Sequence, residues 1–380
     1  KGSIVIAESL SPADMAQMDP TCVSGTGTLL GGAEGHTAIM ARALGIPSVL
    51  GAVGLIDGVR TGDAVIIDGS AGLIVINPNA ETLKRLERRR TEFDKASKRL
   101  ARLKTLPAIS RDGTEIRLQA NIELPIEMAL VEQVAAQGIG LLRSEFMFMN
   151  RQSLPSEDEQ FSVMRQIVEG MNGQPVTIRS LDVGADKASK AVIGEMDDSV
   201  TTALGVRGIR LSLLKPELLE TQFRAMLRAS NYGPVRILLP MVSTVKEVLQ
   251  ARKILESAAA KLRRKKVKIP AALPPLGTMV EVPGAALAAD ALAQVSDFLA
   301  IGSNDLTMYT LAVDRANEHV AGLFDSLHPA VLRLIQFTTG AAMKARIPIS
   351  ICGEMAGDPK LTALLIGLGL RELSMSPANI

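Results

Sequence analysis

The chain has 380 residues, of which 47% are hydrophobic and 22% charged, and its formal net charge is +2 at pH 7. This length exceeds what one hydrophobic core usually organises, so two domains are expected, and the small net charge argues against a dedicated nucleic-acid-binding protein. No apolar run reaches the roughly 18 residues that a membrane-spanning helix requires, so we expect no membrane insertion.

The cysteine content points to a reducing compartment. Cys22 and Cys352 are the only two cysteines, and they could form at most one disulfide. We expect both to be free thiols of a cytoplasmic protein. The chain begins at Lys1 without a methionine and is expected to be a fragment.

Residues 1–77 have the pattern of a small α/β domain. Between two of its expected strands, "HTAIMARAL" has helical spacing and ends at Gly45. The strands are predicted from short apolar runs bounded by Gly, Pro and Asp, namely "SIVIA", "GTLLGG", "IPSVLGA", "DAVIIDG" and "GLIVINP".

Residues 79–104 differ in composition from both flanks. They contain no Gly or Pro, and Leu83, Leu86, Leu100 and Leu103 recur at helix-like intervals among dense charges. This pattern predicts one long, solvated helix. We interpret residues 78–108 as a linker helix between two domains, although an ordinary surface helix would have the same pattern.

Residues 109–380 alternate between strand-like and helical patterns. Helices are expected at 157–171, 216–230, 244–264 and 329–345. Eight strands are predicted at "IRLQANI", "GIGLLRSE", "PVTIRSL", "VRILLPM", "LGTMVEV", "DFLAIG", "IPISICG" and "RELSMS". This alternation predicts an α/β fold with a (β/α)8 TIM barrel, with a doubly wound sheet as the alternative. Because the chain stops just past the eighth strand, the last helix is expected to be missing.

Charged and polar residues gather at the carboxyl ends of these strands, where TIM barrels have their active sites. They are Arg143, Arg179, Asp182, Glu281, Asn304, Asp305, Cys352 and Glu354. Arginine forks bind phosphate and carboxylate groups, and two carboxylates such as Glu281 and Asp305 suit Mg²⁺. Magnesium beside arginines indicates phosphoryl chemistry.

Cys352 and His36 are the candidate reactive groups. A thiol with an ordinary pKa of roughly 8.5 can donate a proton to a carbanion-like carbon, so Cys352 is a candidate acid, with inert packing as the alternative. His36 follows Gly31 and Gly32 and opens an expected helix, where an anion on its imidazole would meet backbone N–H groups. We therefore interpret His36 as a phosphoryl acceptor, with a structural histidine as the alternative.

Several motifs together resemble a known family. "GGAEGHTAIMARALGIPSVLG" resembles the phosphohistidine signature of the PEP-utilising enzymes. "DFLAIGSNDLTMYTLAVDR", "LHPAVLRLI" and "CGEMAGDP" resemble enzyme I of the bacterial phosphotransferase system, the PEP–protein phosphotransferases. The resemblance implies a swivelling phosphohistidine domain, a linker helix and a PEP-binding barrel.

The resemblance also implies a role for each candidate residue. His36 would be phosphorylated, and Cys352 would protonate enolpyruvate to pyruvate. Phosphoenolpyruvate (PEP) would be bound by Arg143, Arg179, Asn304, Asp305 and Arg315, and Mg²⁺ by Glu281 and Asp305. The carrier protein HPr would be the partner, although the module that docks it is expected to be absent from this chain. A homodimer formed through the barrel is the expected assembly, and sugar uptake the expected process.

The chain departs from the family pattern at a few positions. Glu34 and Gly35 stand where the family usually has Thr and Ser before the histidine, Met15 where it often has Thr, and Ala185 where it usually has Gly. These departures bear on the rate of His36 phosphorylation and make a multiphosphoryl transfer paralogue an alternative. The pattern is also compatible with a fragment of pyruvate phosphate dikinase or PEP synthase, and with a non-catalytic PEP-sensing protein.

Overall fold

The computed structural model describes residues 2–11, 14–15, 17–19, 21–32, 36–149, 151–183, 192, 203–314 and 319–380, without the side chains of His36 and Ala43. The chain forms two compact units, Lys1–Leu106 and Pro107–Ile380. No helix in these described ranges is long and apolar enough to cross a membrane.

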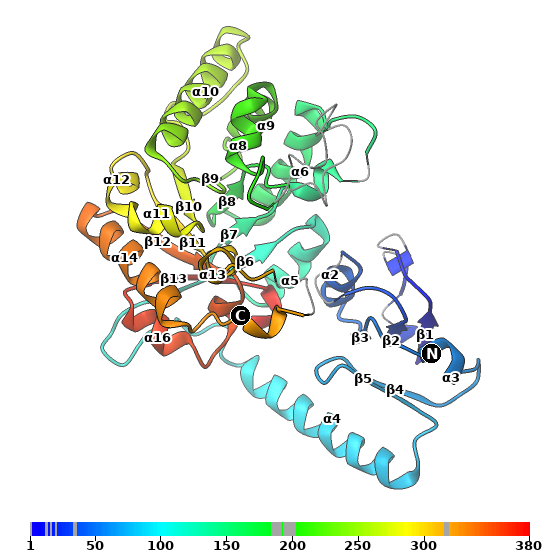
Figure 1. Ribbon diagram of the computed structural model, residues 1–380. Coiled ribbons are helices and arrows are strands. Elements are labelled where there is room, and N and C mark those ends of the chain that lie inside the picture. Colours follow the sequence, from blue (N-terminus) through cyan, green and yellow to red (C-terminus); the bar gives the residue numbers. More distant parts are fainter. Residues whose placement is uncertain are drawn as a thin grey trace. The chain divides into compact units, whose positions relative to one another are not determined.

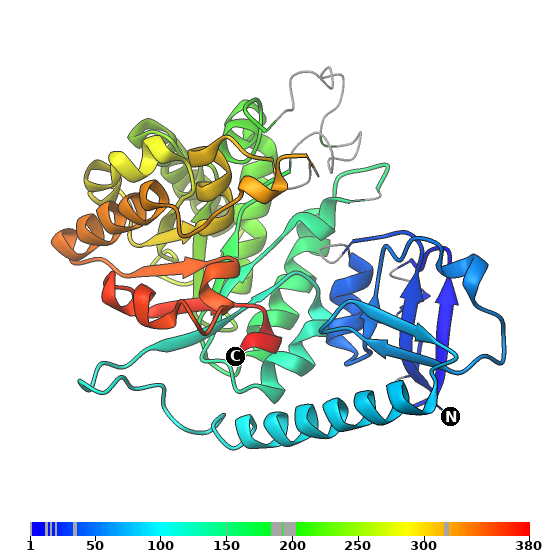
Figure 2. The same cartoon turned by 60° about the horizontal axis from the view of Figure 1, so that its bottom comes forward.

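The first unit contains a small parallel sheet and a hairpin. The sheet has the order β1-β2-β3, and β4 pairs with β5 in antiparallel fashion (Figure 2). The elements are β1 (Ser3–Ala7), β2 (Val23–Thr28), α2 (His36–Ala43), β3 (Ser48–Val49), α3 (Leu55–Gly58), β4 (Val65–Asp68) and β5 (Leu73–Ile76). The predicted helix at "HTAIMARAL" is therefore confirmed as α2.

The second strand, predicted at "GTLLGG" (27–32), lies at Val23–Thr28, so its predicted position is wrong. Its sequence, VSGTGT, has few apolar side chains of its own. Apolar side chains of β4 and β5 lie against it instead. A β-carbon at Gly25 would lie 3.2 Å from the side chain of Ile67, and one at Gly27 would lie 2.8 Å from that of Ile74. The glycines thus leave room for the β4–β5 hairpin, and the apolar signal sits on the hairpin instead.

The long charged segment forms α4 (Ala80–Leu100), followed by turns (Figure 1). The Asn79 side chain caps the helix by accepting a hydrogen bond from the backbone N–H of Thr82 at 2.8 Å. Leu86 is buried, whereas Phe93 and Leu100 are exposed. The predicted long, solvated helix is confirmed, and its role as a linker stays a prediction.

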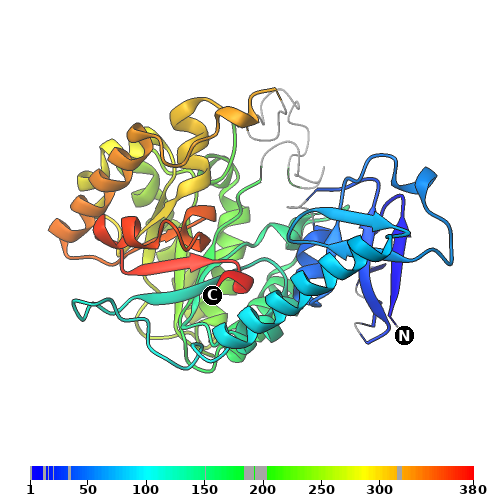
Figure 3. The ribbon, with the colours of Figure 1, turned by 90° about the horizontal axis from the view of Figure 1, so that it is seen from below.

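The second unit is a closed barrel of eight parallel strands, in the order β6 to β13 (Figure 1). β13 pairs with β6, which closes the ring between strands from opposite ends of this unit's sequence (Figure 3). The strands are β6 (Arg117–Ile122), β7 (Ile139–Leu142), β8 (Val176–Arg179), β9 (Val235–Leu239), β10 (Leu276–Val280), β11 (Leu299–Gly302), β12 (Ile349–Cys352) and β13 (Glu372–Met375). All eight predicted strands are confirmed, and the doubly wound alternative is wrong.

Helices and short 3₁₀ turns lie between these strands, and one 3₁₀ turn follows the last of them. The helices are α5 (Met128–Gln133), α6 (Glu157–Gly170), α8 (Ile209–Leu214), α9 (Pro216–Ala229), α10 (Val245–Arg264), α11 (Pro283–Leu287), α12 (Ala289–Ala293), α13 (Ser303–Leu311), α14 (Pro329–Ala345), α15 (Glu354–Gly357) and α16 (Thr362–Gly367). The 3₁₀ turns are η1 (Pro125–Glu127), η2 (Glu145–Phe148), η4 (Ala321–Leu323) and η5 (Pro377–Asn379).

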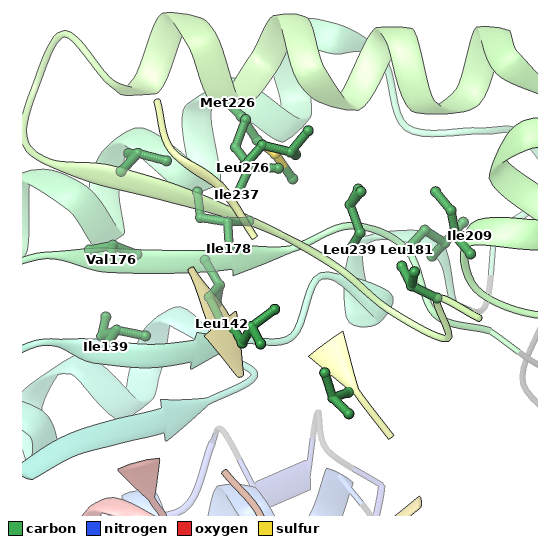
Figure 4. Packing of buried hydrophobic residues seen from close by; sticks show 14 of the residues in the cluster. Ile139, Leu142, Val176, Ile178, Leu181, Ile209, Met226, Ile237, Leu239 and Leu276 are labelled. Carbon is green, nitrogen blue, oxygen red and sulfur yellow. The ribbon is translucent and has the colours of Figure 1, made fainter. Parts of the chain in front are cut away.

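Alternate residues of the strands face opposite sides of the barrel wall. Ile237 and Leu239 belong to the large core in which the strands pack against the helices (Figure 4). Leu238, between them, belongs to a second cluster that also contains Met279 and Cys352. This second cluster therefore fills the inside of the barrel, and Cys352 is its member at the carboxyl end of a strand.

Candidate active site at the carboxyl ends of the barrel strands

Arg179, the last residue of β8, is the centre of a buried ion network. Its Nη2 donates to Glu145 Oε1 at 3.2 Å, and its Nη1 pairs with Asp182 Oδ2 at 3.0 Å. Burial alone would lower the pKa of Arg179, but the two carboxylates outweigh burial and raise that pKa above its usual value. The guanidinium thus stays charged and is fixed from two sides.

Arg207 extends this network to Asp305, in the first turn of the helix that follows β11. Its guanidinium binds Asp182 through Nε at 2.9 Å and through Nη2 at 3.1 Å. It also donates to both oxygens of Asp305, at 3.1 and 3.4 Å, and to the Tyr309 hydroxyl at 3.2 Å. Burial would raise the pKa of Asp182, but Arg179 and Arg207 together hold that pKa below its usual value. Two arginines and three carboxylates, counting Glu145, therefore form one continuous ion network.

Glu281 directly follows β10 and is completely buried. Its Oε1 accepts a hydrogen bond from the Met241 backbone N–H at 2.6 Å, while its Oε2 has no hydrogen-bond partner. A β-carbon at Gly302 would lie 2.6 Å from that Oε2, so the carboxyl needs the glycine beside it. Burial, with the nearby charges of Asp305 and Asp182, raises the pKa of Glu281 to about 8. The charges of Arg179 and Arg207 lower this pKa but do not offset the effects that raise it.

These carboxyl groups fit a hard divalent cation. Glu281 Oε2 is an oxygen donor without a partner, and Asp305, whose charge acts on it, lies in the first turn of α13. No three His, Cys, Asp or Glu side chains converge as a metal site within the described residues. Mg²⁺ commonly takes one or two protein carboxylates and completes its shell with water and phosphate, so two carboxylates suffice.

Cys352 ends β12 and is only 2% exposed. Its Sγ lies 3.5 Å from the carbonyl oxygen of Ile301. Burial, together with the charge of Glu281, raises the pKa of this thiol to about 12. The ordinary thiol pKa assumed from the sequence is therefore wrong for this position. The thiol is protonated at neutral pH and can only donate a proton to a strongly basic atom.

This burial leads to a prediction about thiol reactivity. At pH 8, about one Cys352 in 10⁴ would be thiolate, the form that attacks disulfide reagents. We expect Ellman's reagent to modify one thiol per folded chain quickly, namely the exposed Cys22, and the second thiol only after unfolding in guanidinium. Two rapidly reacting thiols in the folded protein would contradict the described position of Cys352.

Asn304 and Arg143 lie at the same end of the barrel. Asn304 Oδ1 accepts from the Glu354 backbone N–H at 3.1 Å, which ties α13 to α15. Gly353, between Cys352 and Glu354, has φ of 114° and packs against Ser303 and Asn304. Arg143 follows β7, and its side chain is 41% exposed at 4.0 Å from Glu123. A guanidinium and an amide are therefore accessible beside the buried network.

Two sequence comparisons identify the family. The PEP-binding domain of PEP-utilising enzymes matches residues 97–380, and the mobile domain of PEP-utilising enzymes matches residues 1–72. The chain belongs to the PEP-utilising enzyme family.

Two relatives and one solved structure illustrate which proteins this PEP-utilising enzyme is similar to. A phosphoenolpyruvate-protein phosphotransferase from Cupriavidus necator is 46% identical over the whole chain, which spans 65% of that relative's length. A multiphosphoryl transfer protein from Xanthomonas campestris pv. campestris is 42% identical over 99% of this chain, and the match covers 44% of that relative's length. An HpcH/HpaI aldolase/citrate lyase family protein from Burkholderia cenocepacia has a TM-score of 0.45 and 15% identity, covering 74% of this chain and 93% of its own. That score adds nothing to the fold described above.

The predicted site residues of this PEP-utilising enzyme are brought together only in part. Arg179 and Asp305 join one network through Asp182 and Arg207, and charges from this network act on Glu281 and Cys352. Arg315 lies outside the described residues, as do Glu34, Gly35 and Ala185. His36 is the first residue of α2 in the other unit, and its side chain is not described.

Sequence reasoning missed Arg207, Glu145 and Tyr309. Arg207 lies in the connection after β8, well past the strand end, and no periodic pattern marks it. Glu145 had a usable signal, because it is an acid that directly precedes the apolar residues of "EFMF". A buried acid among apolar residues implies a partner of opposite charge.

Proposed function

We propose that this chain carries out the PEP-dependent steps of a phosphoenolpyruvate–protein phosphotransferase. It would transfer the phosphoryl group of PEP to its own His36, releasing pyruvate, and phosphorylated His36 would be the donor to HPr once the carrier is docked by a module outside this chain. This would be the first step of sugar uptake by a phosphotransferase system. Residues 1–77 would carry the histidine, 78–108 would link, and 109–380 would bind PEP.

The observation that carries this proposal is the buried ion network at the strand ends. Arg179 and Arg207 are held charged by acids, in a site that also contains a buried carboxyl oxygen, Glu281 Oε2, without a hydrogen-bond partner. A ligand with a phosphate, a carboxylate and an associated cation would complement all of these groups. PEP with Mg²⁺ has this chemistry.

In the proposed site the arginines bind and orient the substrate. The guanidinium groups of Arg143, Arg179 and Arg315, with the Asn304 amide, would hold the phosphate and carboxylate. Arg207 joins this set because of its position beside Asp182 and Asp305. Glu281 and Asp305 would hold Mg²⁺, which neutralises phosphate charge when bound. Both Asp305 oxygens contact Arg207, so metal binding there implies that this contact loosens.

The chemistry proposed for the two reactive groups conserves atoms and charge. The His36 imidazole nitrogen forms a bond to phosphorus while the bond from phosphorus to the enol oxygen breaks. Enolpyruvate leaves, and its terminal carbon takes the Cys352 proton to give pyruvate. Solvent then reprotonates the thiolate. The high pKa of Cys352 supports this role, because the proton is present at neutral pH and passes only to a basic carbon.

The remaining features of the proposal concern the setting of the protein. We infer that the small domain swings between PEP and the carrier, that the barrel forms a homodimer, and that the protein is cytoplasmic. The free thiols Cys22 and Cys352 support a reducing compartment. A multiphosphoryl transfer protein is the second candidate, favoured by the 42% identical relative of that name.

The experiment that tests the proposal is isotope exchange. With unlabelled PEP, Mg²⁺ and this chain present, label should pass from pyruvate into PEP without any nucleotide, because unlabelled PEP phosphorylates His36 and labelled pyruvate then takes the phosphoryl group back. A requirement for nucleotide would indicate a dikinase or PEP synthase instead. Absence of exchange under every condition would indicate a non-catalytic PEP-binding protein.

One substitution tests the proton donor within this proposal. Cys352→Ala should fold and bind PEP, because the arginines and the metal-binding carboxyls remain. Its rate of pyruvate formation should fall by about 10²- to 10⁴-fold, as is typical when a general acid is removed. Pyruvate release measured with lactate dehydrogenase decides this. An unchanged rate would assign Cys352 to packing alone.

A further inference from the structure

Glu145 is a buried acid that the proposed chemistry does not use. It begins η2, two residues after Arg143, and it is 6% exposed. Its Oε1 accepts two hydrogen bonds, from Arg179 Nη2 at 3.2 Å and from the Asp182 backbone N–H at 2.9 Å. One carboxylate oxygen thus contacts both the guanidinium and the residue that anchors the other side of that guanidinium.

The consequence of this geometry is a closed ring of contacts. Asp182 binds Arg179 Nη1 at 3.0 Å, Glu145 binds Arg179 Nη2, and Glu145 binds the backbone of Asp182. Rotation of the Arg179 guanidinium would break at least one charge-assisted hydrogen bond. Glu145 lies two residues after Arg143, so the ring also fixes the segment that contains Arg143 relative to the Arg179 guanidinium.

A contribution to folding stability does not by itself explain why the side chain at position 145 is a carboxylate. Burial raises the pKa of Glu145, which shows that the charged form is disfavoured by its surroundings. Within the Glu145–Arg179 ion pair, Glu145 Oε2 and Arg179 Nε are also buried without hydrogen-bond partners. The hydroxyl of the neighbouring Ser144 donates a hydrogen bond to the Arg179 carbonyl oxygen at 2.9 Å, and this bond already connects the same segment to β8. Gln222 Nε2 then donates to that hydroxyl at 3.0 Å.

We propose that Glu145 is a positioning residue for substrate binding, which holds the Arg179 guanidinium in the orientation that receives the anionic groups of PEP. The inference rests on the proposed function, because it takes Arg179 as a PEP ligand. Glu145 itself does not contact the substrate. Its negative charge keeps Arg179 aligned before the substrate arrives, so the binding energy is not used to order the side chain.

The test is an equilibrium measurement of PEP binding in a chain that cannot turn PEP over. In a His36→Ala background, with Mg²⁺ present, calorimetry gives the Kd of intact PEP. Adding Glu145→Ala should raise that Kd by about 10- to 100-fold, as is typical for loss of an orienting partner of a ligand. Glu145→Gln keeps the acceptor oxygen without the charge, and it should partly rescue binding, with a Kd raised by about 5- to 10-fold.

Ser144→Ala is the matched control, since it removes the neighbouring tie without touching the guanidinium. It should lower the melting temperature yet change the Kd less than twofold. Equal losses of binding in Ser144→Ala and Glu145→Ala would overturn the proposal. If the alanine variant of Glu145 does not fold, Glu145→Gln decides, and a Kd equal to that of the parent would also overturn it. Failure of the His36→Ala parent to bind PEP would instead refute the proposed function.

Discussion

Incubated with PEP and Mg²⁺, the wild-type chain is expected to become a phosphoprotein, and the His36→Ala variant is expected to incorporate no phosphate. The nitrogen–phosphorus bond of phosphohistidine is hydrolysed by acid and stable in base, which distinguishes it from a phosphoserine. Radiolabelled PEP, followed by acid and alkali treatment of the protein, measures this directly.

The expectation follows from what the barrel offers as acceptors. His328 is the N-cap of α14, and its Nδ1 accepts a hydrogen bond from the Ala330 backbone N–H at 3.2 Å. That is a structural use of the imidazole. His319 lies in the connection between α13 and η4, outside any motif of the proposed chemistry. In-line transfer requires the acceptor nitrogen within about 3–3.5 Å of phosphorus. We therefore expect the acceptor to come from the first unit, which contains His36.

The controls for this prediction are the other two histidines. His319→Ala and His328→Ala should retain full phosphorylation, although the second variant should be less stable because it loses a helix cap. A phosphopeptide containing position 319 or 328 instead of 36 would falsify the assignment of the acceptor.

The barrel could be predicted from the sequence because its strands have faces buried against both the helices and the interior. Strands such as β7 (IGLL) and β11 (LAIG) consist of continuous apolar residues, all of them buried. By contrast, the position of β2 could not be predicted, because its glycines carry no signal of their own. The residues that cover it, such as Ile74, lie on a hairpin some distance along the chain.

The site was predictable only where topology fixes position. Residues at strand ends, such as Arg179 and Glu281, could be found because all parallel strands of a barrel end at one rim. Arg207 reaches Asp182 and Asp305 from a long connection, and only the folded chain brings these side chains together. The pKa of Cys352 could not be predicted for the same reason, because burial depends on tertiary packing.

Glu281→Gln is expected to abolish PEP turnover while leaving the fold intact. The glutamine side-chain oxygen can still accept the hydrogen bond from the Met241 backbone N–H, so the loop after β9 keeps its anchor. The substitution removes a group that can ionise when Mg²⁺ binds, and it makes the unpartnered Oε2 an amide nitrogen, which cannot ligate Mg²⁺. Calorimetric titration of Mg²⁺ in the presence of PEP should show a large loss of affinity, and PEP–pyruvate exchange should fall to background.

Glu372→Gln provides the comparison that separates metal binding from the general cost of altering a buried acid. Glu372 is a buried carboxylate that binds Arg117 at 3.3 Å and Arg236 at 3.0 Å. It begins β13, whereas Glu281 follows the end of β10, so the two acids lie at opposite ends of the barrel. Its replacement should lower the melting temperature through loss of two ion pairs, while Mg²⁺ affinity and exchange stay close to wild type. If Glu281→Gln behaved in the same way, with exchange intact, the carboxyl would serve only to anchor Met241, and the metal would have to be bound elsewhere.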